Sequence, residues 1–182
     1  MAEEQQFTVA PNMKNLIASH IHSIYLKPGE VLATRSPMLV STVLGSCVAV
    51  TMFSPSRGFG AICHAMLPAN SDREEDLRYV DTAVKHLYAK AMEQGAGADL
   101  VVKLFGGAHV LGIKDNKLAK LTIGEQNVAQ AEAVLGSLGL VASARHTGGY
   151  RGRKLFFCTR SGDIFLRAIR TGKHALIKDT AR

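Results

Sequence analysis

Tryptophan is missing from this 182-residue sequence, and aromatic residues of all kinds make up only 6% of it. Sites for single-stranded nucleic acid usually combine aromatic side chains with a basic groove. Here the Lys and Arg residues behind the net charge of +7 are scattered along the chain, so we do not expect nucleic-acid binding. An acidic protein partner suits this charge better.

Cysteine is scarce: Cys47, Cys63 and Cys158 form an odd set without a C-x-x-C pair. This argues against a disulfide framework and against a zinc knuckle. His20 and His22, two positions apart, suggest a metal pair, but no third ligand lies nearby in the sequence. We therefore expect no metal site, and each thiol has to be explained singly.

Long hydrophobic runs are also missing, and no window reaches the length of a transmembrane helix. The first twelve residues, MAEEQQFTVAPN, are acidic and polar, whereas a secretory signal is basic and then apolar. We expect a cytoplasmic protein without membrane insertion. No internal repeat is visible, and 47% hydrophobic residues are enough to form the core of one domain.

What the sequence does contain is a series of apolar, β-branched segments separated by turns, with two amphipathic helices among them. The i, i+3, i+4 spacing of apolar residues predicts one helix from Val80 to Met92, with Ser71 and Glu74 at capping-box spacing near its start. The same reasoning predicts a second helix over residues 124–139. Strands are predicted over residues 21–26, 31–35, 38–53, 59–67, 99–107, 140–146, 154–159 and 164–169.

The first two of these strands are expected to form one hairpin and the next two a second hairpin. Hairpins around two helices indicate an α+β fold: a layered α/β sandwich of largely antiparallel strands flanked by two main helices. The domain is expected to span residues 19–170. A loosely ordered N-terminal arm, residues 1–18, would precede it, and a basic C-terminal tail, residues 171–182, would follow it.

The second predicted hairpin gives Cys47 a partner. If residues 54–57 form its loop, positions whose numbers sum to 111 are paired, and Cys47 lies opposite His64 with Cβ atoms about 5 Å apart. An imidazole at that distance can take the proton of a thiol and make it a nucleophile. A loop that is one residue longer would place the two side chains on opposite faces.

Neighbouring residues complete this hypothetical site. Gly45 allows a backbone turn from which the N–H groups of Ser46 and Cys47 could stabilise an oxyanion. Ser41 and Thr42, on the incoming strand, are the nearest polar residues that could orient the imidazole. The alternative is that Cys47 is an inert small hydrophobe, as buried cysteines usually are. The pattern alone leaves both interpretations open.

Five blocks, LGSCVAV, HAMLP, KLFGGAHVL, IGEQNV and GGYRGRKLFF, occur in this order between about Ile21 and Ile169. In sequence and separation they resemble the CheD family of chemoreceptor glutamine deamidases. The resemblance implies an α/β sandwich that hydrolyses glutamine side chains of methyl-accepting chemotaxis receptors through a thioester, without metal or organic cofactor. It assigns the catalytic cysteine to Cys47 and the histidine to His64. The family's threonine, six positions before the cysteine, falls on Ser41, with Thr42 as the alternative.

The resemblance also bears on partners. It implies the cytoplasmic helical region of the receptors as substrate, and some family members dock onto CheC-type phosphatases. A binding module with little or no turnover is therefore the alternative function. From the sequence itself we expect Phe105, Gly106 and Gly107 to form either a close turn beside the active site or a partner-docking edge with Phe105 exposed, and we expect further partner contacts at Arg151 and Arg153. The protein is expected to be a monomer, and His109, which departs from the family pattern, has no assigned role.

Overall fold

The computed structural model describes residues 22–69, 75–109 and 121–169. Within these ranges the strands form two sheets. The first sheet has the order β1-β3-β8-β9, with β1 His22–Tyr25, β3 Met38–Leu44, β8 Arg153–Cys158 and β9 Ile164–Ala168. The second sheet has the order β2-β5-β4-β6-β7, with β2 Val31–Thr34, β5 Phe59–Ala65, β4 Val48–Ser54, β6 Val101–Gly106 and β7 Ala144–Thr147.

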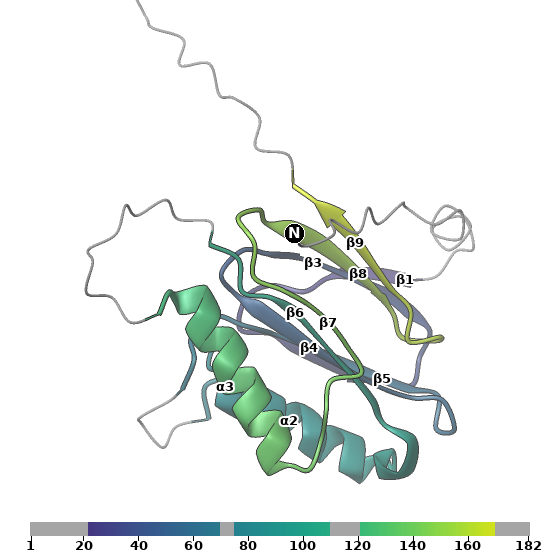
Figure 1. The fold of residues 1–182 in the computed structure, drawn as a ribbon. Helices are drawn as coiled ribbons and strands as arrows, with labels where there is room; N and C mark the ends of the chain where they lie inside the picture. Colours follow the sequence, from purple (N-terminus) through teal and green to yellow (C-terminus); the bar gives the residue numbers. More distant parts are fainter. Residues whose placement is uncertain (1–21, 70–74, 110–120, 170–182) are drawn as a thin grey trace, which may run out of the picture.

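Three layers result. The first sheet lies over one face of the second sheet, and the helices α2 Val80–Glu93 and α3 Ile123–Ser137 cover the other face (Figure 1). A short 3₁₀ helix, η1 Gly97–Asp99, leads from α2 to β6. Among the described residues, five of the seven strand pairings are antiparallel, and β1/β3 and β6/β7 are parallel. The predicted α+β layered fold is confirmed.

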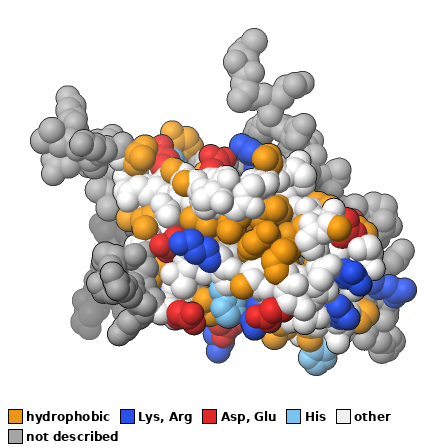
Figure 2. Space-filling view, turned by 90° about the horizontal axis from the view of Figure 1, so that it is seen from below, with side chains coloured by type: hydrophobic (Ala, Val, Ile, Leu, Met, Phe, Trp, Pro, Cys, Tyr) orange, Lys and Arg blue, Asp and Glu red, His pale blue; other side chains and the backbone are white. Residues whose placement is uncertain are grey.

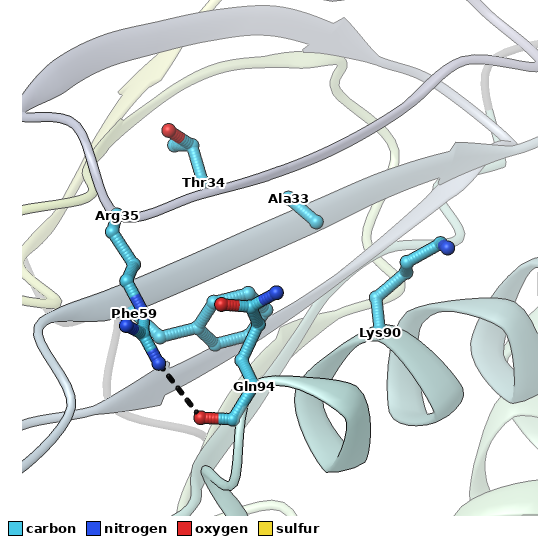
Figure 3. A pocket seen from close by; sticks show the side chains of 6 residues that line it. All are labelled: Ala33, Thr34, Arg35, Phe59, Lys90 and Gln94. Carbon is cyan, nitrogen blue, oxygen red and sulfur yellow. Dashed lines mark hydrogen bonds between the residues drawn. The ribbon is translucent and has the colours of Figure 1, made fainter.

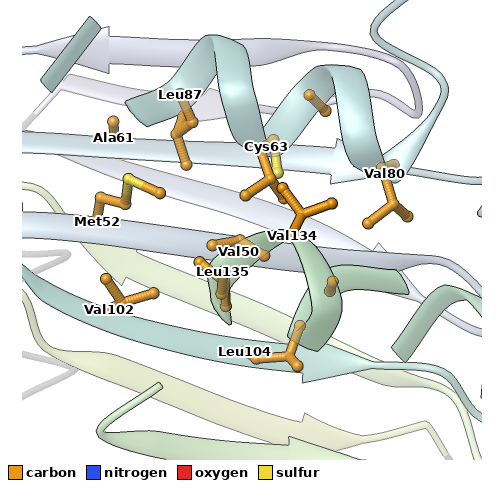
Figure 4. Packing of buried hydrophobic residues seen from close by; sticks show 14 of the residues in the cluster. Val50, Met52, Ala61, Cys63, Val80, Leu87, Val102, Leu104, Val134 and Leu135 are labelled. Atoms are coloured by element: carbon orange, nitrogen blue, oxygen red, sulfur yellow. The ribbon is translucent and has the colours of Figure 1, made fainter. Parts of the chain in front are cut away.

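Each interface between layers has its own apolar core. Between the second sheet and the helices, side chains such as Val50, Met52, Leu87, Leu104 and Leu135 are fully or almost fully buried (Figure 4). Between the two sheets, the core contains Leu26, Val40, Leu44, Ala49, Ile62, Phe105, Leu155 and Phe157. Because β4 and β5 are buried on both faces, they read as continuous apolar runs rather than alternating ones.

The predicted hairpin over residues 21–35 is wrong. β1 pairs in parallel with β3 in the first sheet, while β2 pairs with β5 in the second sheet. The turn between them therefore crosses from one layer to the other. Local alternation in the sequence identified both strands, but it carries no information on which distant strand each one joins.

Helix boundaries agree closely with the prediction, but the capping differs. α2 starts after Tyr79, which makes no side-chain cap, and Gly95 follows its end with φ +67°. The predicted cap at Ser71 and Glu74 lies outside the described residues, as do the predicted arm (1–18) and tail (171–182). α3 has a capping box, in which Thr122 and Glu125 satisfy each other's backbone N–H groups. Neither helix in the described ranges is long and apolar enough to span a membrane.

Candidate active site

The segment Gly45–Cys47 connects β3 of the first sheet with β4 of the second. All three of its carbonyl groups accept hydrogen bonds. Gly45 O accepts from Ala108 N at 2.8 Å, Cys47 O accepts from Gly107 N at 2.8 Å, and Ser46 O accepts from the Asn127 side chain at 2.9 Å. In a trans peptide the N–H points away from the preceding C=O. The amides of Ser46 and Cys47 are therefore directed away from these donors.

The close fit of this segment depends on Gly106, the last residue of β6, and on Gly107, which follows it. Gly106 has φ +110°, and a Cβ atom there would lie 2.1 Å from the Cys47 carbonyl oxygen. Gly107 has φ +68°, and a Cβ atom there would lie 2.4 Å from Val128. Gly45 itself is not among the glycines with positive φ. The positive-φ backbone next to Cys47 thus belongs to Gly106 and Gly107.

The predicted strand register is wrong by two positions. Ala49, not Cys47, lies opposite His64, because the turn occupies residues 55–58 and Ser54 still pairs with Phe59. The Ser54 hydroxyl donates to the Asp99 carboxylate. Extending the β4/β5 register by one residue puts Cys47 and His64 in diagonal positions on the same face, where Cβ atoms lie within about 7–8 Å of each other. Cys47 packs against the core between the sheets, as Ala49 does.

The hydroxyl beside the imidazole belongs to Thr42, the alternative to Ser41. Thr42 Oγ1 lies 2.8 Å from His64 Nδ1 and donates to the Leu26 carbonyl at 2.8 Å. Because a threonine hydroxyl has one proton, its oxygen accepts from Nδ1–H. Nδ1 therefore carries the proton of the neutral ring, and Nε2 carries the lone pair.

β3 presents Thr42 to the imidazole without any bulge. Its pairing with β8 is continuous, with Ser41 opposite Phe156 and Thr42 opposite Leu155. Since side chains alternate along a strand, Thr42 faces the inter-sheet core with Val40 and Leu44, and Ser41 faces the other way. Ser41 is half-buried on the outer face of the first sheet.

His64 is buried, with 1% of its surface exposed, and its Nε2 atom has no hydrogen-bond partner. Burial lowers the pKa of His64 below 6.5, while the Leu26 carbonyl and Glu30 act in the opposite direction. The ring is therefore neutral at physiological pH. An imidazole with a free lone pair at Nε2 is the form that a general base needs.

The three thiols differ sharply in their surroundings. Cys47 is half-buried, and burial raises the pKa of its thiol above 9.0, while its own backbone amide acts in the opposite direction. Cys63 is enclosed between the second sheet and the helices (Figure 4), and burial raises its pKa to about 11. Cys158 is buried as well. Cys47 is the thiol that a reagent can reach.

For residues 105–107 the structure agrees with the close turn and not with an exposed docking edge, and it also buries one of the two arginines expected to contact a partner. Phe105 is only 4% exposed and belongs to the inter-sheet core, and Gly106 and Gly107 are buried against the Cys47 segment. Arg153 is also buried, and its guanidinium donates to the carbonyls of His146 and Gly148. These residues close the ends of the two sheets beside the site. Arg151 is exposed, and a partner contact there stays a prediction.

A cavity of about 280 Å³ lies elsewhere on the molecule. It is lined by Ala33, Thr34, Arg35, Phe59, Lys90 and Gln94, between β2 and the end of α2 (Figure 3). None of the predicted site residues contributes to it. Within its lining, Arg35 donates to the Gln94 carbonyl. Because its lining contains neither Cys47 nor His64, this cavity is not part of the thiol–imidazole site.

Two residues near the site had no predicted role. Asn127, from the block IGEQNV, is fully buried and bonded to the Cys47 segment. Its signal in the sequence is a polar residue on the apolar face of a helix, in register with Ala131 and Leu135. His109 lies 3.6 Å from Glu125 and stacks obliquely on Tyr150, with 30% of its side chain exposed.

In the described ranges no group of three or more His, Cys, Asp or Glu side chains is arranged to hold a metal.

A partly exposed thiol, a buried imidazole with a free Nε2 and a hydroxyl at Nδ1 are the groups of a cysteine-dependent hydrolase site. Comparison with known proteins supports this class. The family model "CheD chemotactic sensory transduction" matches residues 66–168, directly after the His64 segment.

Curated relatives match more of the chain. A protein of Geobacter sulfurreducens named "Probable chemoreceptor glutamine deamidase CheD 2" is 43% identical over 147 residues, 80% of this chain and 89% of its own. A CheD of Maridesulfovibrio salexigens with the corresponding name is 42% identical over 83% of this chain and 94% of its own. One of Methanococcus maripaludis is 32% identical over 78% and 92%. The chain belongs to the CheD family.

Proposed function

We propose that this protein deamidates glutamine side chains of chemoreceptors, with Cys47 as nucleophile and His64 as general base and acid. The observation that carries the proposal is the bond between His64 Nδ1 and Thr42, which leaves Nε2 free on the face that Cys47 shares. Thr42, rather than Ser41, is the orienting hydroxyl in this proposal. The relatives' names, which describe chemoreceptor glutamine deamidases, support the choice of substrate.

The first half of the reaction forms a thioester. His64 Nε2 takes the proton of Cys47, and the thiolate attacks the side-chain carbonyl carbon of the glutamine. The negative charge on the carbonyl oxygen is stabilised by the N–H groups of Ser46 and Cys47. The C–N bond then breaks, and the imidazolium returns its proton to the departing ammonia.

The second half regenerates the enzyme. His64 removes a proton from water, the resulting hydroxide attacks the thioester carbonyl, and the C–S bond breaks. Glutamate forms, and Cys47 recovers its proton. The chain's own residues supply every proton transfer in both halves, so the proposal requires no cofactor.

The resting site fits a mechanism in which the thiol is activated only during the reaction. Burial disfavours the charged forms of both Cys47 and His64, and no hydrogen bond joins them at rest, since Nε2 has no partner. Rotation of the Cys47 side chain has to bring Sγ to Nε2 before proton transfer. A neutral pair avoids leaving a reactive thiolate exposed in the absence of substrate.

The face of the molecule drawn in Figure 2 is not strongly basic. Figure 2 shows Lys and Arg side chains alternating with Asp and Glu around a central group of hydrophobic side chains. The net charge of +7 therefore acts on an acidic partner as a whole rather than through this face. Docking onto a CheC-type phosphatase, a monomeric state and a cytoplasmic location stay predictions.

The proposal is tested by mixing the purified protein with cytoplasmic fragments of chemoreceptors and measuring glutamine-to-glutamate conversion by peptide mass spectrometry. We expect conversion by the wild type and none by Cys47→Ala or His64→Gln. Cys63→Ala is the matched control, because it removes a thiol from the opposite face of the same sheet, and it should retain activity. Conversion by Cys47→Ala at the wild-type rate would refute the proposal. No conversion by the wild type on any receptor fragment would leave the binding module as the function.

A further inference from the structure

Asn127 lies on the face of α3 that packs against the second sheet. Its neighbours on this face, Ala131, Val134 and Leu135, are apolar and buried, whereas Asn127 is a polar residue with no exposed surface. Burying an amide in an apolar layer is unfavourable unless its hydrogen bonds are made. The contacts of this one side chain therefore need an explanation that helix packing alone does not provide.

The amide nitrogen of Asn127 joins the two segments that carry the reactive groups. Nδ2 donates to Ser46 O and to Met66 O, both at 2.9 Å. Ser46 directly precedes Cys47, and Met66 follows His64 by two residues. Both protons of Nδ2 are used, and Oδ1 is buried without a partner in the protein. The amide nitrogen of Asn127 thus bridges the two segments, while its amide oxygen is left without a hydrogen bond.

The bond to Ser46 has a direct consequence for the nucleophile. The Ser46 carbonyl and the Cys47 N–H belong to one planar peptide unit and point in opposite directions. Fixing the carbonyl therefore fixes the direction of the Cys47 N–H. Burial raises the pKa of the Cys47 thiol, and this N–H acts in the opposite direction.

We propose that Asn127 is a positioning residue, which holds the Ser46–Cys47 peptide so that its N–H serves the sulfur and the oxyanion, and which ties this peptide to the end of the His64 strand. The inference rests on the proposed function, because the oxyanion exists only if Cys47 attacks a carbonyl. Asn127 does not touch the reacting atoms in this scheme. It acts through the orientation of the backbone.

A purely structural role is the competing explanation, and the chain offers a matched control for it. Thr159 is likewise buried, and its hydroxyl likewise joins two backbone groups, Ser36 O and Met38 N. These contacts lie at the start of β3, whereas Cys47 follows its end. Thr159→Val removes a buried polar connection without touching the Cys47 segment.

The test compares Asn127→Leu with Thr159→Val in two measurements on the full chain. The first is the rate of Cys47 alkylation by iodoacetamide as a function of pH, which reports the thiol pKa without any receptor. The second is kcat and KM for receptor-fragment deamidation, with urea unfolding to record the stability of each variant. We expect Asn127→Leu to raise the thiol pKa and to lower kcat about 10- to 100-fold, with KM nearly unchanged. Thr159→Val should leave both kinetic readouts within about twofold of wild type even where it loses as much stability.

An unchanged pH profile of alkylation in Asn127→Leu, or equal effects of the two substitutions, would overturn the inference. If Asn127→Leu does not fold, Asn127→Ser applies the same test, because its smaller side chain leaves room for water beside both carbonyl groups. If Asn127→Leu raises the thiol pKa relative to the wild type but the wild type deamidates no receptor fragment, only the proposed function is contradicted. A wild type that deamidates, together with Asn127 variants of normal pH profile and kcat, would contradict only this inference.

Discussion

At the scale of single residues, the site depends on the positions of two protons, those of the Thr42 hydroxyl and of the His64 ring. Thr42 gives its only proton to the Leu26 carbonyl and therefore accepts one from His64 Nδ1. This leaves Nε2 with the lone pair, and Nε2 is the atom that acts as the base in the proposed mechanism. Ser41 has a hydroxyl as well, but strand alternation points it away.

This assignment predicts opposite results for two neighbouring hydroxyls. Thr42→Val keeps the shape of the side chain but removes the acceptor for Nδ1–H, and we expect kcat to fall by roughly 10- to 100-fold. Ser41→Ala should change kcat little, and Thr42→Ser should remain close to wild type. Steady-state kinetics on receptor fragments decide the question. A large loss in Ser41→Ala with normal activity in Thr42→Val would show that Ser41 orients the histidine.

His64 also predicts how stability depends on pH. Burial lowers its pKa in the folded chain, whereas an unfolded chain titrates near 6.5. Between these two pKa values the unfolded state binds more protons, so the free energy of unfolding decreases as the pH falls below 6.5. Urea unfolding at about pH 5 and about pH 7.5 should show a smaller decrease for His64→Gln than for the wild type. Equal decreases in both proteins would contradict a depressed pKa at His64.

At the scale of secondary-structure elements, local patterns predicted most of the strands and both helices. The helix over residues 80–92 was predicted within a residue or two because its apolar spacing repeats over four turns. Sheet membership could not be predicted, since β1 and β2 pair with strands that lie outside their local sequence. The hairpin register failed because a shift of the turn by one position, from 54–57 to 55–58, moves every pair by two.

The candidate site was predicted only in part, for the same physical reason. Cys47 and His64 were identified because a thiol after a glycine and a histidine in the next strand stand out chemically. The choice of Thr42 over Ser41 depends on which face of β3 meets the second sheet, which is a tertiary property. The burial of Phe105 and Arg153 likewise follows from the packing of two sheets and is not visible in either segment alone.

The contact between β6 and the Cys47 segment predicts a specific sensitivity. Gly106→Ala places a Cβ atom 2.1 Å from the Cys47 carbonyl oxygen in addition to its unfavourable φ. Gly139→Ala is the control, because Gly139 also has positive φ, +70°, but nothing lies within 4 Å of its Cβ position. We expect Gly139→Ala to cost about 1 to 2 kcal/mol of unfolding free energy and Gly106→Ala to cost clearly more, with slower Cys47 alkylation. Equal costs would show that the segment moves aside freely.

At the scale of the whole molecule, the three layers separate a partly exposed thiol from two buried ones. Cys63 lies between the second sheet and the helices, Cys158 is buried in the first sheet, and Cys47 lies where the chain passes between the sheets. The packing of the two sheets at this connection brings together Thr42 from the first sheet and His64 from the second. The candidate catalytic groups thus come from both sheets, so the candidate site requires the two sheets to pack together.

This arrangement predicts the order of thiol modification. In the folded protein iodoacetamide should label Cys47 well before Cys63 and Cys158, because burial holds the Cys63 pKa at about 11 and encloses both other thiols. In concentrated urea all three should react at similar rates. Peptide mass spectrometry at successive times measures the order. Equal labelling of Cys63 in the folded chain would contradict the layered burial described here.

The central claim is that Cys47 becomes covalently attached to the receptor glutamine. The most direct measurement is the mass of the intact protein after rapid acid quenching during turnover with a receptor peptide. The mechanism predicts a species heavier by the peptide minus one ammonia, with the added mass on Cys47 and absent in Cys47→Ala. Full deamidation with no such species, and with undiminished activity in Cys47→Ala, would contradict the account.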